Sequence, residues 1–427
     1  MTGIGRRVAI VEGCRTPFAK SGTAFRSLSA VELGKVAVRE LVSRTNLDVR
    51  EVDHLVYGTV VQSVQEPNIA REVTLGSGLP ASVPAFTVGR ACASSSQAIT
   101  SGAEQIALGL ADVVVAGGAE SLTDIPILVS DEMRDALVAA SKARSLGDRI
   151  KPFLGLRPRN LAPITPAIAE PTTGLTMGQS AEIMAQENGI SREAQDEWAL
   201  RSHRLAWAAT EDGRLTHEIA PVFVDGVAVT RDNGIRPDTS LEKLAQLKPV
   251  FDRKYGTVTA GNSSPLTDGA SAVLLMSEEK ARALGYEPLG YIRSYAYAAL
   301  APSDQLLQGP VLAAPVALER AGLSMGDIDL MDMHEAFAAQ VLSNLQWLDS
   351  KKIAEERLGL SEPVGHPPVE RINVMGGSIA IGHPFGATGG RITITLLNEL
   401  KRRGQQFGLI SVCAAGAMGF VMVVERG

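Results

Sequence analysis

Short β-prone runs alternate with segments of helical periodicity along most of this 427-residue chain, and this alternation restricts the fold more than any other feature. The apolar run at residues 8–11 is followed by a turn-rich loop and then by residues 29–43, whose apolar side chains recur at helical spacing. Further strands are predicted at residues 52–58 and 113–116, and a further helix begins near residue 94. Such alternation is typical of the α/β class.

Part of this pattern occurs twice. Residues 46–55 align with residues 322–331 at one constant offset, which pairs Leu47 with Leu323, Val52 with Ile328 and Asp53 with Asp329. The same offset carries Gly58 onto His334. A repeat of this kind predicts two similar α/β halves, with reactive side chains at corresponding strand ends, where open α/β sheets place their ligands.

Between the two halves the alternation fades into helical stretches, such as residues 191–210. We therefore predict an inserted loop domain at residues 121–250. The first half then comprises residues 1–120 together with 251–285, and the second half comprises residues 286–427.

The composition excludes several classes of protein. The formal net charge is −6, so the chain lacks the basic character of nucleic-acid-binding proteins, and no nucleic-acid partner is expected. Its cysteines, Cys14, Cys92 and Cys413, are too few and too scattered for a disulfide framework or a zinc site, so no metal is expected. With no signal sequence and no run long enough to cross a membrane, a reducing, cytoplasmic location is predicted.

Cys92 stands where an extended segment gives way to a helix, because residues 83–88 are β-prone and the residues from Ser94 onward have helical spacing. Main-chain N–H groups and the dipole at a helix N-terminus favour a thiolate. We therefore expect a lowered pKa and a nucleophilic role for Cys92. The alternative is that Cys92 is a small buried apolar residue, as most free cysteines are.

A glycine-rich run at residues 373–390 surrounds His383. This density of glycine indicates a main chain pressed close to another group, and a phosphate-binding loop is excluded because its glycine spacing and its Gly-Lys-Ser/Thr are missing. His383 is either a hydrogen-bonded histidine in a turn or the base that activates a thiol. Cys413 follows another β-prone run, and a second thiol can move a proton while the first attacks.

Several motifs resemble those of the thiolase family, and they follow the family's order along nearly the whole chain. They are residues 15–18, the Cys92 segment, residues 117–121, 256–264, 334–337 and 382–389, and the Cys413 loop. The resemblance implies an α/β thiolase fold, in which two similar five-stranded halves form an αβαβα layering with an inserted loop domain. It also implies a homodimer or a homotetramer.

Three positions depart from the common thiolase pattern. Most thiolases have asparagine in place of His334, glycine in place of Ser95 and glycine in place of Ala415. The histidine at position 334, together with residues 151–153 and 161–163 of the insert, makes the chain similar to the β subunits of the fatty-acid-oxidising trifunctional complex. This similarity implies a hydratase–dehydrogenase α subunit as partner. Since an oxyanion site needs only the main-chain N–H of Ala415, it is expected to survive the substitution.

The resemblance implies CoA-dependent cleavage of a 3-oxoacyl-CoA to acetyl-CoA and a shortened acyl-CoA in fatty acid β-oxidation, through an acyl-cysteine. Cys92, activated by His383, would attack, and Cys413 would protonate the resulting enolate. His334 and His383 would stabilise the enolate oxygen, and the N–H groups of Cys92 and Ala415 would stabilise the tetrahedral adduct.

Coenzyme A is then a substrate, and no cofactor is expected. By the same resemblance, Ser264 and Arg236 would hold its pantetheine and nucleotide ends. The alternatives are an acetoacetyl-CoA thiolase working in the condensing direction, a decarboxylating ketoacyl synthase and a non-catalytic CoA- or lipid-binding scaffold. Cys413 disfavours the synthase, whose third residue would not be a cysteine, and the full set of expected catalytic side chains disfavours the scaffold.

Residues 134–159 of the insert form a basic stretch, with seven basic and two acidic residues. Apolar residues are interspersed at partly helical spacing: Leu137, Val138, Ile150, Phe153 and Leu154. This pattern is common in interfacial helices, so we expect a docking surface for a partner subunit or peripheral contact with an anionic membrane. A solvated helix over a neighbouring subunit, or basic residues near the CoA phosphates, would have the same composition.

Overall fold

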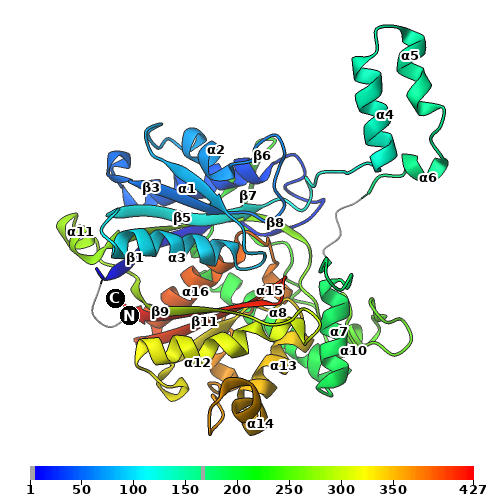
Figure 1. The fold of residues 1–427 in the computed structure, drawn as a ribbon. Helices are drawn as coiled ribbons and strands as arrows, with labels where there is room; N and C mark the ends of the chain where they lie inside the picture. Colours follow the sequence, from blue (N-terminus) through cyan, green and yellow to red (C-terminus); the bar gives the residue numbers. More distant parts are fainter. Residues whose placement is uncertain (1–4, 165–168) are drawn as a thin grey trace.

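The computed structural model of the chain describes residues 5–164 and 169–427. Two sheets lie one above the other, with helices on both outer faces and a pair of helices between them (Figure 1). The outer helices are α1 (Ala30–Thr45) and α12 (Gly309–Ala321), and the inner pair is α3 (Ser94–Ala107) and α16 (Thr388–Arg403). The layers therefore run α, β, α, β, α, and the predicted α/β architecture is confirmed.

The first sheet has the strand order β1, β8, β5, β3, β4. These strands span, in that order, Val8–Arg15, Thr267–Ser277, Val113–Glu120, His54–Gly58 and Ala85–Val88. Both β4 and β5 run parallel to β3, whereas β8 is antiparallel to β5 and to β1. Helices cover both faces of β5 and β8, which are buried along their whole length, and this explains their runs of apolar and small residues.

The second sheet repeats this arrangement with the strand order β9, β12, β11, β10. Its hydrogen bonding is continuous with that of the first sheet, because β9 also pairs antiparallel with β1, at Ala9 and Ile10. These strands span Gly290–Ala299, Met418–Arg426, Phe407–Ala414 and Leu330–Met333. Only β10 and β11 are parallel, as β3 and β5 are in the first sheet. Among the described residues, the fifth position, beside β10, holds just an isolated parallel bridge between Met331 and Ile372. The two halves are thus alike in topology, with the last strand of the second half reduced to a bridge.

The repeat seen in the sequence coincides with this duplication. β3 begins at His54 and β10 begins at Leu330, which are matched positions of the aligned segments. Gly58 ends β3, and His334 directly follows β10. In the same way, α3 leads into β5 and α16 leads into β11. The duplicated topology is established by these elements, while the residue bounds given above for the three domains stay a prediction.

The chain leaves the layers between β5 and β8. A helical arm projects far from the body, at the upper right of Figure 1. The arm contains α4 (Asp131–Lys142), α5 (Leu146–Ile150) and α6 (Pro158–Leu161). Two main-chain hydrogen bonds between Leu128 and Ile164 close its base. The chain then returns to the body as α7 (Met177–Glu187) and α8 (Arg192–Glu211).

Shorter elements complete the fold. They are β2 (Ala19–Lys20), α2 (Ile69–Gly76), α9 (Arg214–His217), β6 (Val222–Val224), β7 (Val227–Val229), α10 (Leu241–Ala245), α11 (Glu278–Ala283), α13 (Ala338–Leu348), α14 (Lys351–Ile353) and α15 (Ser378–Ile381). Helix α1 begins with a capping box of Ser29 and Glu32. In contrast, the N-cap residues of α3 and α16 make no side-chain cap hydrogen bond. The N–H of Gly390 in the first turn of α16 donates instead to Oγ of Ser95 in the first turn of α3 at 3.0 Å, which joins the starts of the two inner helices.

Candidate active site

Cys92 lies on a sharp turn between β4 and α3. The preceding residue, Ala91, has a φ of 43°, in the left-handed region that residues with a side chain seldom adopt. Ser94 holds this turn, because its hydroxyl accepts from the N–H of Arg90 at 2.9 Å and donates to the carbonyl of Ala91 at 2.7 Å. The left-handed residue costs about 1 kcal/mol, which surrounding contacts must offset. The predicted position of the thiol just before a helix is confirmed.

His383 follows the short helix α15 through Gly382, whose φ is 111°. A β-carbon at Gly382 would lie 2.8 Å from the side chain of Thr267, so only glycine fits here. The hydroxyl of Thr267 accepts a hydrogen bond from the N–H of His383 at 3.1 Å. The glycine in front of this histidine therefore serves a close approach of the loop to the start of β8.

His334 and Cys413 come from adjacent strands of the second sheet. The N–H of His334, directly after β10, donates to the carbonyl of Ser411 in β11 at 2.8 Å. Cys413 lies two residues further along β11 and is buried. The parallel alignment of these strands brings the histidine and the second thiol to the same edge of the sheet.

Three of the predicted residues converge tightly. The sulfur of Cys92 and one ring nitrogen each of His334 and His383 all lie within 4.8 Å of one another. The imidazole rings of the two histidines are 4.0 Å apart between centroids. Cys413 is close enough to Cys92 for a charge there to raise the pKa of Cys413, and the main-chain N–H of Ala415 is directed at the Cys92 sulfur. The structure therefore brings together Cys92, His334, His383, Cys413 and Ala415.

Both histidines are neutral at neutral pH. Burial lowers the pKa of His383 to about 3, with a smaller contribution from the positive charge of Arg391. Burial likewise lowers the pKa of His334 well below its ordinary value, and His383 and Arg391 add to the effect. A neutral imidazole carries one hydrogen and one lone pair, so each ring can serve as a donor at one nitrogen and as an acceptor at the other.

The expected lowering of the Cys92 pKa is wrong. Burial raises the pKa of Cys92 to about 11, and the N–H groups of Ala415 and of Cys92 itself oppose the rise without overcoming it. Desolvation outweighs the helix terminus because it acts on the whole thiolate charge, whereas two hydrogen bonds return only part of the lost solvation. Burial also raises the pKa of Cys413 well above its ordinary value. Both thiols are protonated at neutral pH, so thiolate formation requires a base.

Two buried carboxylates that the sequence reading missed support the site. Glu120, at the end of β5, accepts hydrogen bonds from the N–H groups of Val60, Val61 and Gly386 at 2.9–3.0 Å. Burial raises the pKa of Glu120 to about 7. Glu335, next to His334, accepts from the side chains of Trp198, Ser202 and Asn373 at 2.7–3.0 Å. Both residues lie within motifs noted in the sequence, at residues 117–121 and 334–337, and this position could have indicated their role.

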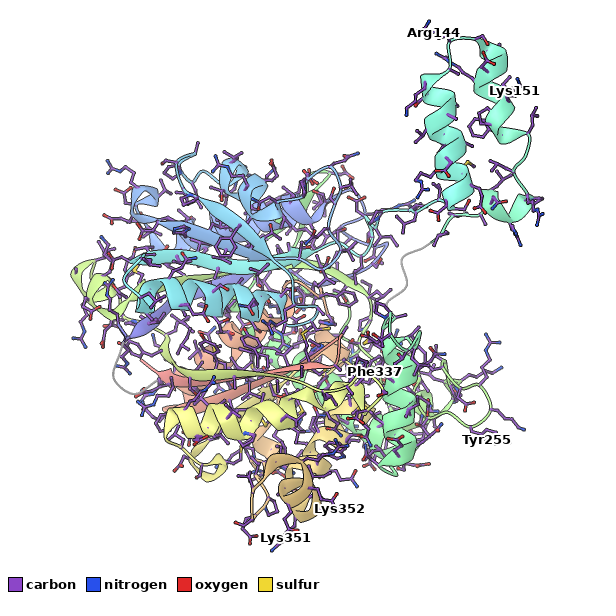
Figure 2. The ribbon with its side chains drawn as sticks, viewed as in Figure 1. Arg144, Lys151, Tyr255, Phe337, Lys351 and Lys352 are labelled. Atoms are coloured by element: carbon purple, nitrogen blue, oxygen red, sulfur yellow. The ribbon has the colours of Figure 1, made fainter. Side chains whose placement is uncertain are left out.

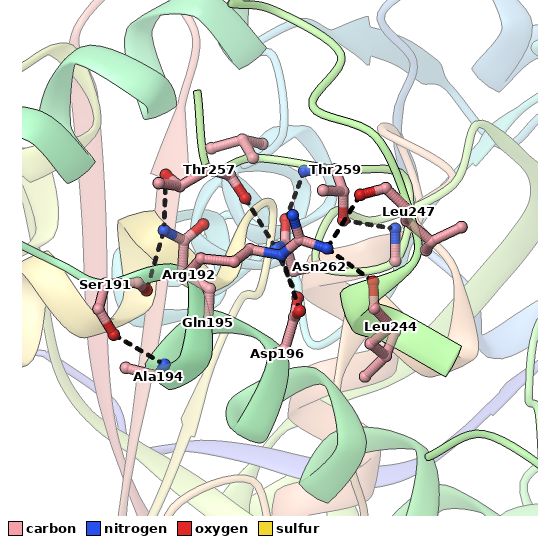
Figure 3. Close-up of polar contacts among 12 residues, drawn as sticks. Ser191, Arg192, Ala194, Gln195, Asp196, Leu244, Leu247, Thr257, Thr259 and Asn262 are labelled. Atoms are coloured by element: carbon pink, nitrogen blue, oxygen red, sulfur yellow. Dashed lines mark hydrogen bonds and ion pairs between the residues drawn. The ribbon is translucent and has the colours of Figure 1, made fainter. Parts of the chain in front are cut away.

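The loop that carries Ser264 is braced from helix α8, as Figure 3 shows. Asn262 donates to Asp196 of α8 at 2.9 Å and to the carbonyl of Thr257 at 3.1 Å, and its own oxygen accepts from the N–H of Thr259 at 2.7 Å. The N–H of Ser264 then donates to the carbonyl of Ala336 at 2.9 Å, two residues beyond His334. Ser264 is thus held beside the segment that carries a central residue of the site.

Arg236 lies in an exposed segment that borders the site from another side. Its main-chain N–H donates to Nδ1 of His203 at 3.2 Å. Burial lowers the pKa of both His203 and Lys20, and the positive charge of Arg236 lowers each further. A β-carbon at Gly234 would lie 2.6 Å from the carbonyl of Ala380 in α15, which leads to His383. A positively charged neighbourhood therefore lies next to the helix that precedes the His383 loop.

Among the described residues, the set that could hold a metal is Cys92, His334 and His383. The same set supplies a thiol, a base and a hydrogen-bond donor, which are the groups needed for acyl transfer to cysteine. The expectation that the protein needs no metal and no cofactor stays a prediction.

Comparison of the chain with protein-family models shows which family it belongs to. The model of the thiolase N-terminal domain matches residues 8–279, and the model of the thiolase C-terminal domain matches residues 286–426. The chain belongs to the thiolase family. The predicted family is thereby confirmed, and with it the assignment of the chain as an acyltransferase.

Similar proteins align with this thiolase over nearly its whole length. It is 51% identical over 423 residues to a 3-ketoacyl-CoA thiolase of Pseudoalteromonas translucida, covering 99% of this chain and 97% of the relative. A 3-ketoacyl-CoA thiolase of Yersinia pestis is 50% identical over 427 residues, covering 100% and 98% of the two chains. These relatives agree with the predicted type of thiolase.

Solved structures agree on the fold of this thiolase. The acetyl-CoA acetyltransferase of Bacillus anthracis has a TM-score of 0.84 at 35% identity, and 100% of each chain is covered. Human mitochondrial 3-ketoacyl-CoA thiolase in complex with CoA also has a TM-score of 0.84, at 33% identity, with 99% of this chain and 98% of the human chain covered. In residues 5–164 and 169–427 of this thiolase, no helix is both long enough and apolar enough to span a bilayer.

Proposed function

We propose that this thiolase is a 3-ketoacyl-CoA thiolase, which cleaves 3-oxoacyl-CoA with CoA to give acetyl-CoA and an acyl-CoA shortened by two carbons in fatty acid β-oxidation. The observation that carries the proposal is the convergence of the Cys92 sulfur with a nitrogen of each histidine within 4.8 Å, beside a second buried thiol. One thiol can form the acyl-enzyme while the other moves a proton. Full-length identity of about half with 3-ketoacyl-CoA thiolases supports the choice of reaction.

In the first half-reaction, the sulfur of Cys92 attacks the 3-keto carbon and its proton passes to His383. The C2–C3 bond then breaks, and its electron pair forms the enolate of acetyl-CoA. Cys413 gives its proton to C2 and becomes a thiolate. Acetyl-CoA leaves, and the shortened acyl group remains on Cys92 as a thioester.

In the second half-reaction, the Cys413 thiolate takes the proton of an incoming CoA thiol. The CoA sulfur attacks the acyl carbon, the bond to Cys92 breaks, and the departing sulfur of Cys92 recovers its proton from His383. Both cysteines end protonated, which agrees with the raised pKa of each thiol. No oxidant and no metal takes part in these steps.

Two sets of donors stabilise the negative oxygens. His334 and protonated His383 face the enolate oxygen, and the main-chain N–H groups of Cys92 and Ala415 face the oxygen of the tetrahedral adduct. Loss of one such donor typically costs about 3 kcal/mol of transition-state stabilisation. Burial strengthens these interactions because competing water is excluded.

Coenzyme A is held, in this proposal, by Ser264 at the pantetheine and by Arg236 at the nucleotide end. The position of Ser264 beside the His334 segment supports its role. Arg236 is supported by the positively charged neighbourhood that it shares with Lys20 next to α15. An arginine is suited to phosphate because its guanidinium donates two parallel hydrogen bonds.

The helical arm is proposed to dock on a hydratase–dehydrogenase partner subunit, and the working unit is proposed to be a homodimer or homotetramer in the cytoplasm. Arg144 and Lys151 lie at the far end of the arm, away from the body (Figure 2). Leu146, Ile150 and Leu154 are exposed on it by 75%, 52% and 79%. Such apolar exposure beside positive charge indicates a contact surface. The cytoplasmic location is supported by the free thiols of all the cysteines.

The experiment is a CoA-dependent cleavage assay with acetoacetyl-CoA and with a long-chain 3-oxoacyl-CoA. The proposal expects turnover of both, with the long-chain substrate preferred, and an acyl adduct on Cys92 by peptide mass spectrometry. A preference for acetoacetyl-CoA would instead favour the acetoacetyl-CoA thiolase, the activity suggested by the name of the Bacillus anthracis relative. An adduct on Cys413 or Cys14 would overturn the assignment of the nucleophile.

A further inference from the structure

The two histidines of the site are bound at their far nitrogens by different hydroxyl groups. Nδ1 of His383 lies 2.6 Å from Oγ1 of Thr388, and Nδ1 of His334 lies 2.9 Å from Oγ of Ser378. In both rings, Nε2 is buried and has no hydrogen-bond partner within the described part of the chain. Each hydroxyl therefore selects which nitrogen of its histidine carries the hydrogen, and so what the free Nε2 can do.

Thr388 has already committed its only hydrogen. Its hydroxyl donates to the carbonyl of Pro384 at 3.0 Å, one turn back in the chain. A threonine hydroxyl has one hydrogen, so its contact with His383 must be one in which the oxygen accepts. Nδ1 of His383 consequently carries the ring hydrogen, and Nε2 of His383 carries the lone pair.

The hydroxyl of Ser378 donates to its histidine, unlike that of Thr388, because of the neighbouring Arg391. The guanidinium of Arg391 is fully buried beside Asp332, and its Nη2 lies 3.4 Å from the oxygen of Ser378. An arginine can only donate, so the serine oxygen accepts from it. The single hydroxyl hydrogen of Ser378 has one acceptor among its contacts in the described residues, which is Nδ1 of His334. Nδ1 of His334 therefore carries the lone pair, and its Nε2 carries the hydrogen.

We propose that Thr388 and Ser378 hold the two histidines in opposite tautomers, so that Nε2 of His383 is an acceptor and Nε2 of His334 is a donor before substrate binds. Thr388 and Ser378 are then positioning residues, and Arg391 acts through Ser378. The assignment of the tautomers stands on the hydrogen bonds alone, while its meaning for catalysis rests on the proposed function.

The opposite tautomers divide the work between two adjacent rings. An acceptor at Nε2 of His383 can take the proton of Cys92, whereas a hydrogen there would block that step. A donor at Nε2 of His334 can meet the enolate oxygen without a prior proton transfer. Once His383 has taken the thiol proton, its Nε2 becomes a second donor toward the same oxygen.

The direct test is ¹⁵N NMR of the unliganded full-length protein in its native oligomer at neutral pH, with only the histidines labelled. The chain has six histidines, and the single variants His334→Gln and His383→Gln assign the two signals. We expect an N–H type shift for Nδ1 and a lone-pair type shift for Nε2 of His383, and the reverse for His334. The same tautomer in both rings, or a doubly protonated ring, would overturn the proposal whether or not the protein is a thiolase.

A chemical test uses iodoacetamide alkylation of Cys92, followed by peptide mass spectrometry, which needs no substrate. Thr388→Val should slow alkylation about tenfold to a hundredfold, because Nδ1 of His383 loses its acceptor. Thr388→Ser should restore the rate. The matched control is Thr393→Val, since Thr393 is also buried in α16 and donates to the carbonyl four residues back, at 2.8 Å, without touching a histidine. Equal effects of Thr388→Val and Thr393→Val would reduce Thr388 to a structural role and contradict the proposal.

The variant Ser378→Ala tests the role of Ser378 separately from that of Thr388. It should leave Cys92 alkylation within about twofold, because His383 keeps its tautomer, yet lower kcat of thiolysis about tenfold to a hundredfold with little change in KM. In its NMR spectrum, only the His334 signals should shift toward a mixture of tautomers. A variant in which alkylation falls as far as thiolysis would show that Ser378 does not act through His334. Absence of thiolysis in the unmodified protein, with the expected NMR result, would reject the proposed function alone.

Discussion

The carboxylate of Glu120 accepts a hydrogen bond from the N–H of Gly386 at 2.9 Å, and so ties the end of β5 to the turn that follows His383. The same carboxylate accepts from the N–H groups of Val60 and Val61, just beyond β3. One buried side chain therefore connects two strand ends of the first half to the histidine loop of the second half. This connection is expected to hold the His383 loop in place against the first half.

Glu120→Gln is expected to weaken both the fold and the reaction. The amide keeps the size of the side chain but places N–H groups against N–H donors, which should cost about 1–3 kcal/mol of unfolding free energy. A shift of the His383 loop should also lower kcat about tenfold. Urea unfolding and thiolysis measure the two effects. The control is Glu32→Gln in the exposed capping box of α1, which should lose about 0.5–1 kcal/mol with no change in kcat. Loss of stability with an unchanged kcat would show that Glu120 stabilises the fold without affecting the reaction.

Cys413→Ala is expected to separate acyl transfer from carbon–carbon bond cleavage. The variant keeps Cys92 and His383, so an activated acyl donor should still label Cys92. It lacks the acid for C2 and the base for CoA, so thiolysis should fall about 10²–10⁴-fold. Stopped-flow acylation and steady-state assays measure the two steps, with Cys14→Ala as the control at another buried cysteine. Wild-type turnover without Cys413 would refute its role in proton transfer.

His334→Ala is expected to lower kcat about 10²–10³-fold with a small effect on KM, because a donor aimed at developing charge acts mainly in the transition state. His334→Asn should recover part of the rate, since an amide can donate from a similar position. His366→Ala serves as a control, because His366 pairs with Asp349 at the surface. A variant that raises KM alone would show that His334 only binds substrate.

The alkylation rate of Cys92 should be independent of pH between about pH 5 and pH 9, because the reactive ion pair has the same number of protons as the neutral Cys92–His383 pair. The rate falls only when His383 is protonated, toward its pKa of about 3, and rises only as Cys92 ionises, toward its pKa of about 11. In His383→Gln, the rate should instead rise about tenfold per pH unit. Iodoacetamide labelling at several pH values measures both slopes. A tenfold rise per unit in the unmodified protein would rule out His383 as the base.

The triple variant Arg144→Glu, Arg149→Glu, Lys151→Glu should keep thiolysis within about twofold and lose salt-sensitive association with a hydratase–dehydrogenase subunit. Within one chain the arm projects away from the body, so its charges are not expected to assist catalysis there (Figure 2). Lys351→Glu, Lys352→Glu, Arg357→Glu makes the same charge change at another surface and should leave association intact. Retained subunit binding with lost adsorption to anionic vesicles would assign the arm to a membrane. Lost thiolysis in the first variant would place its charges at the active site.

The α/β class and the duplicated halves could be predicted from the sequence, and Cys92, His334, His383 and Cys413 could be chosen as candidate site residues. Hydrophobic periodicity is a local property, and β3 and β10 begin at the matched positions His54 and Leu330 because both are short buried strands of the same pattern. Cys92 could be placed at a helix start for the same reason. The glycine-rich run around His383 also predicted a close approach, which the contact of Gly382 with Thr267 explains.

The environments of these groups depend on tertiary contacts. The pKa of Cys92 is raised, although its position at a helix terminus predicted the reverse, because the desolvation of this half-buried thiol depends on residues that are distant in the sequence. The hydrogen bonds of Glu120 join segments separated by 266 positions in the chain. The opposite environments of the two Nδ1 atoms depend on Arg391, which reaches Ser378 only after α16 has packed between the sheets. Side-chain identity sets the available chemistry, and packing selects which proton each group holds.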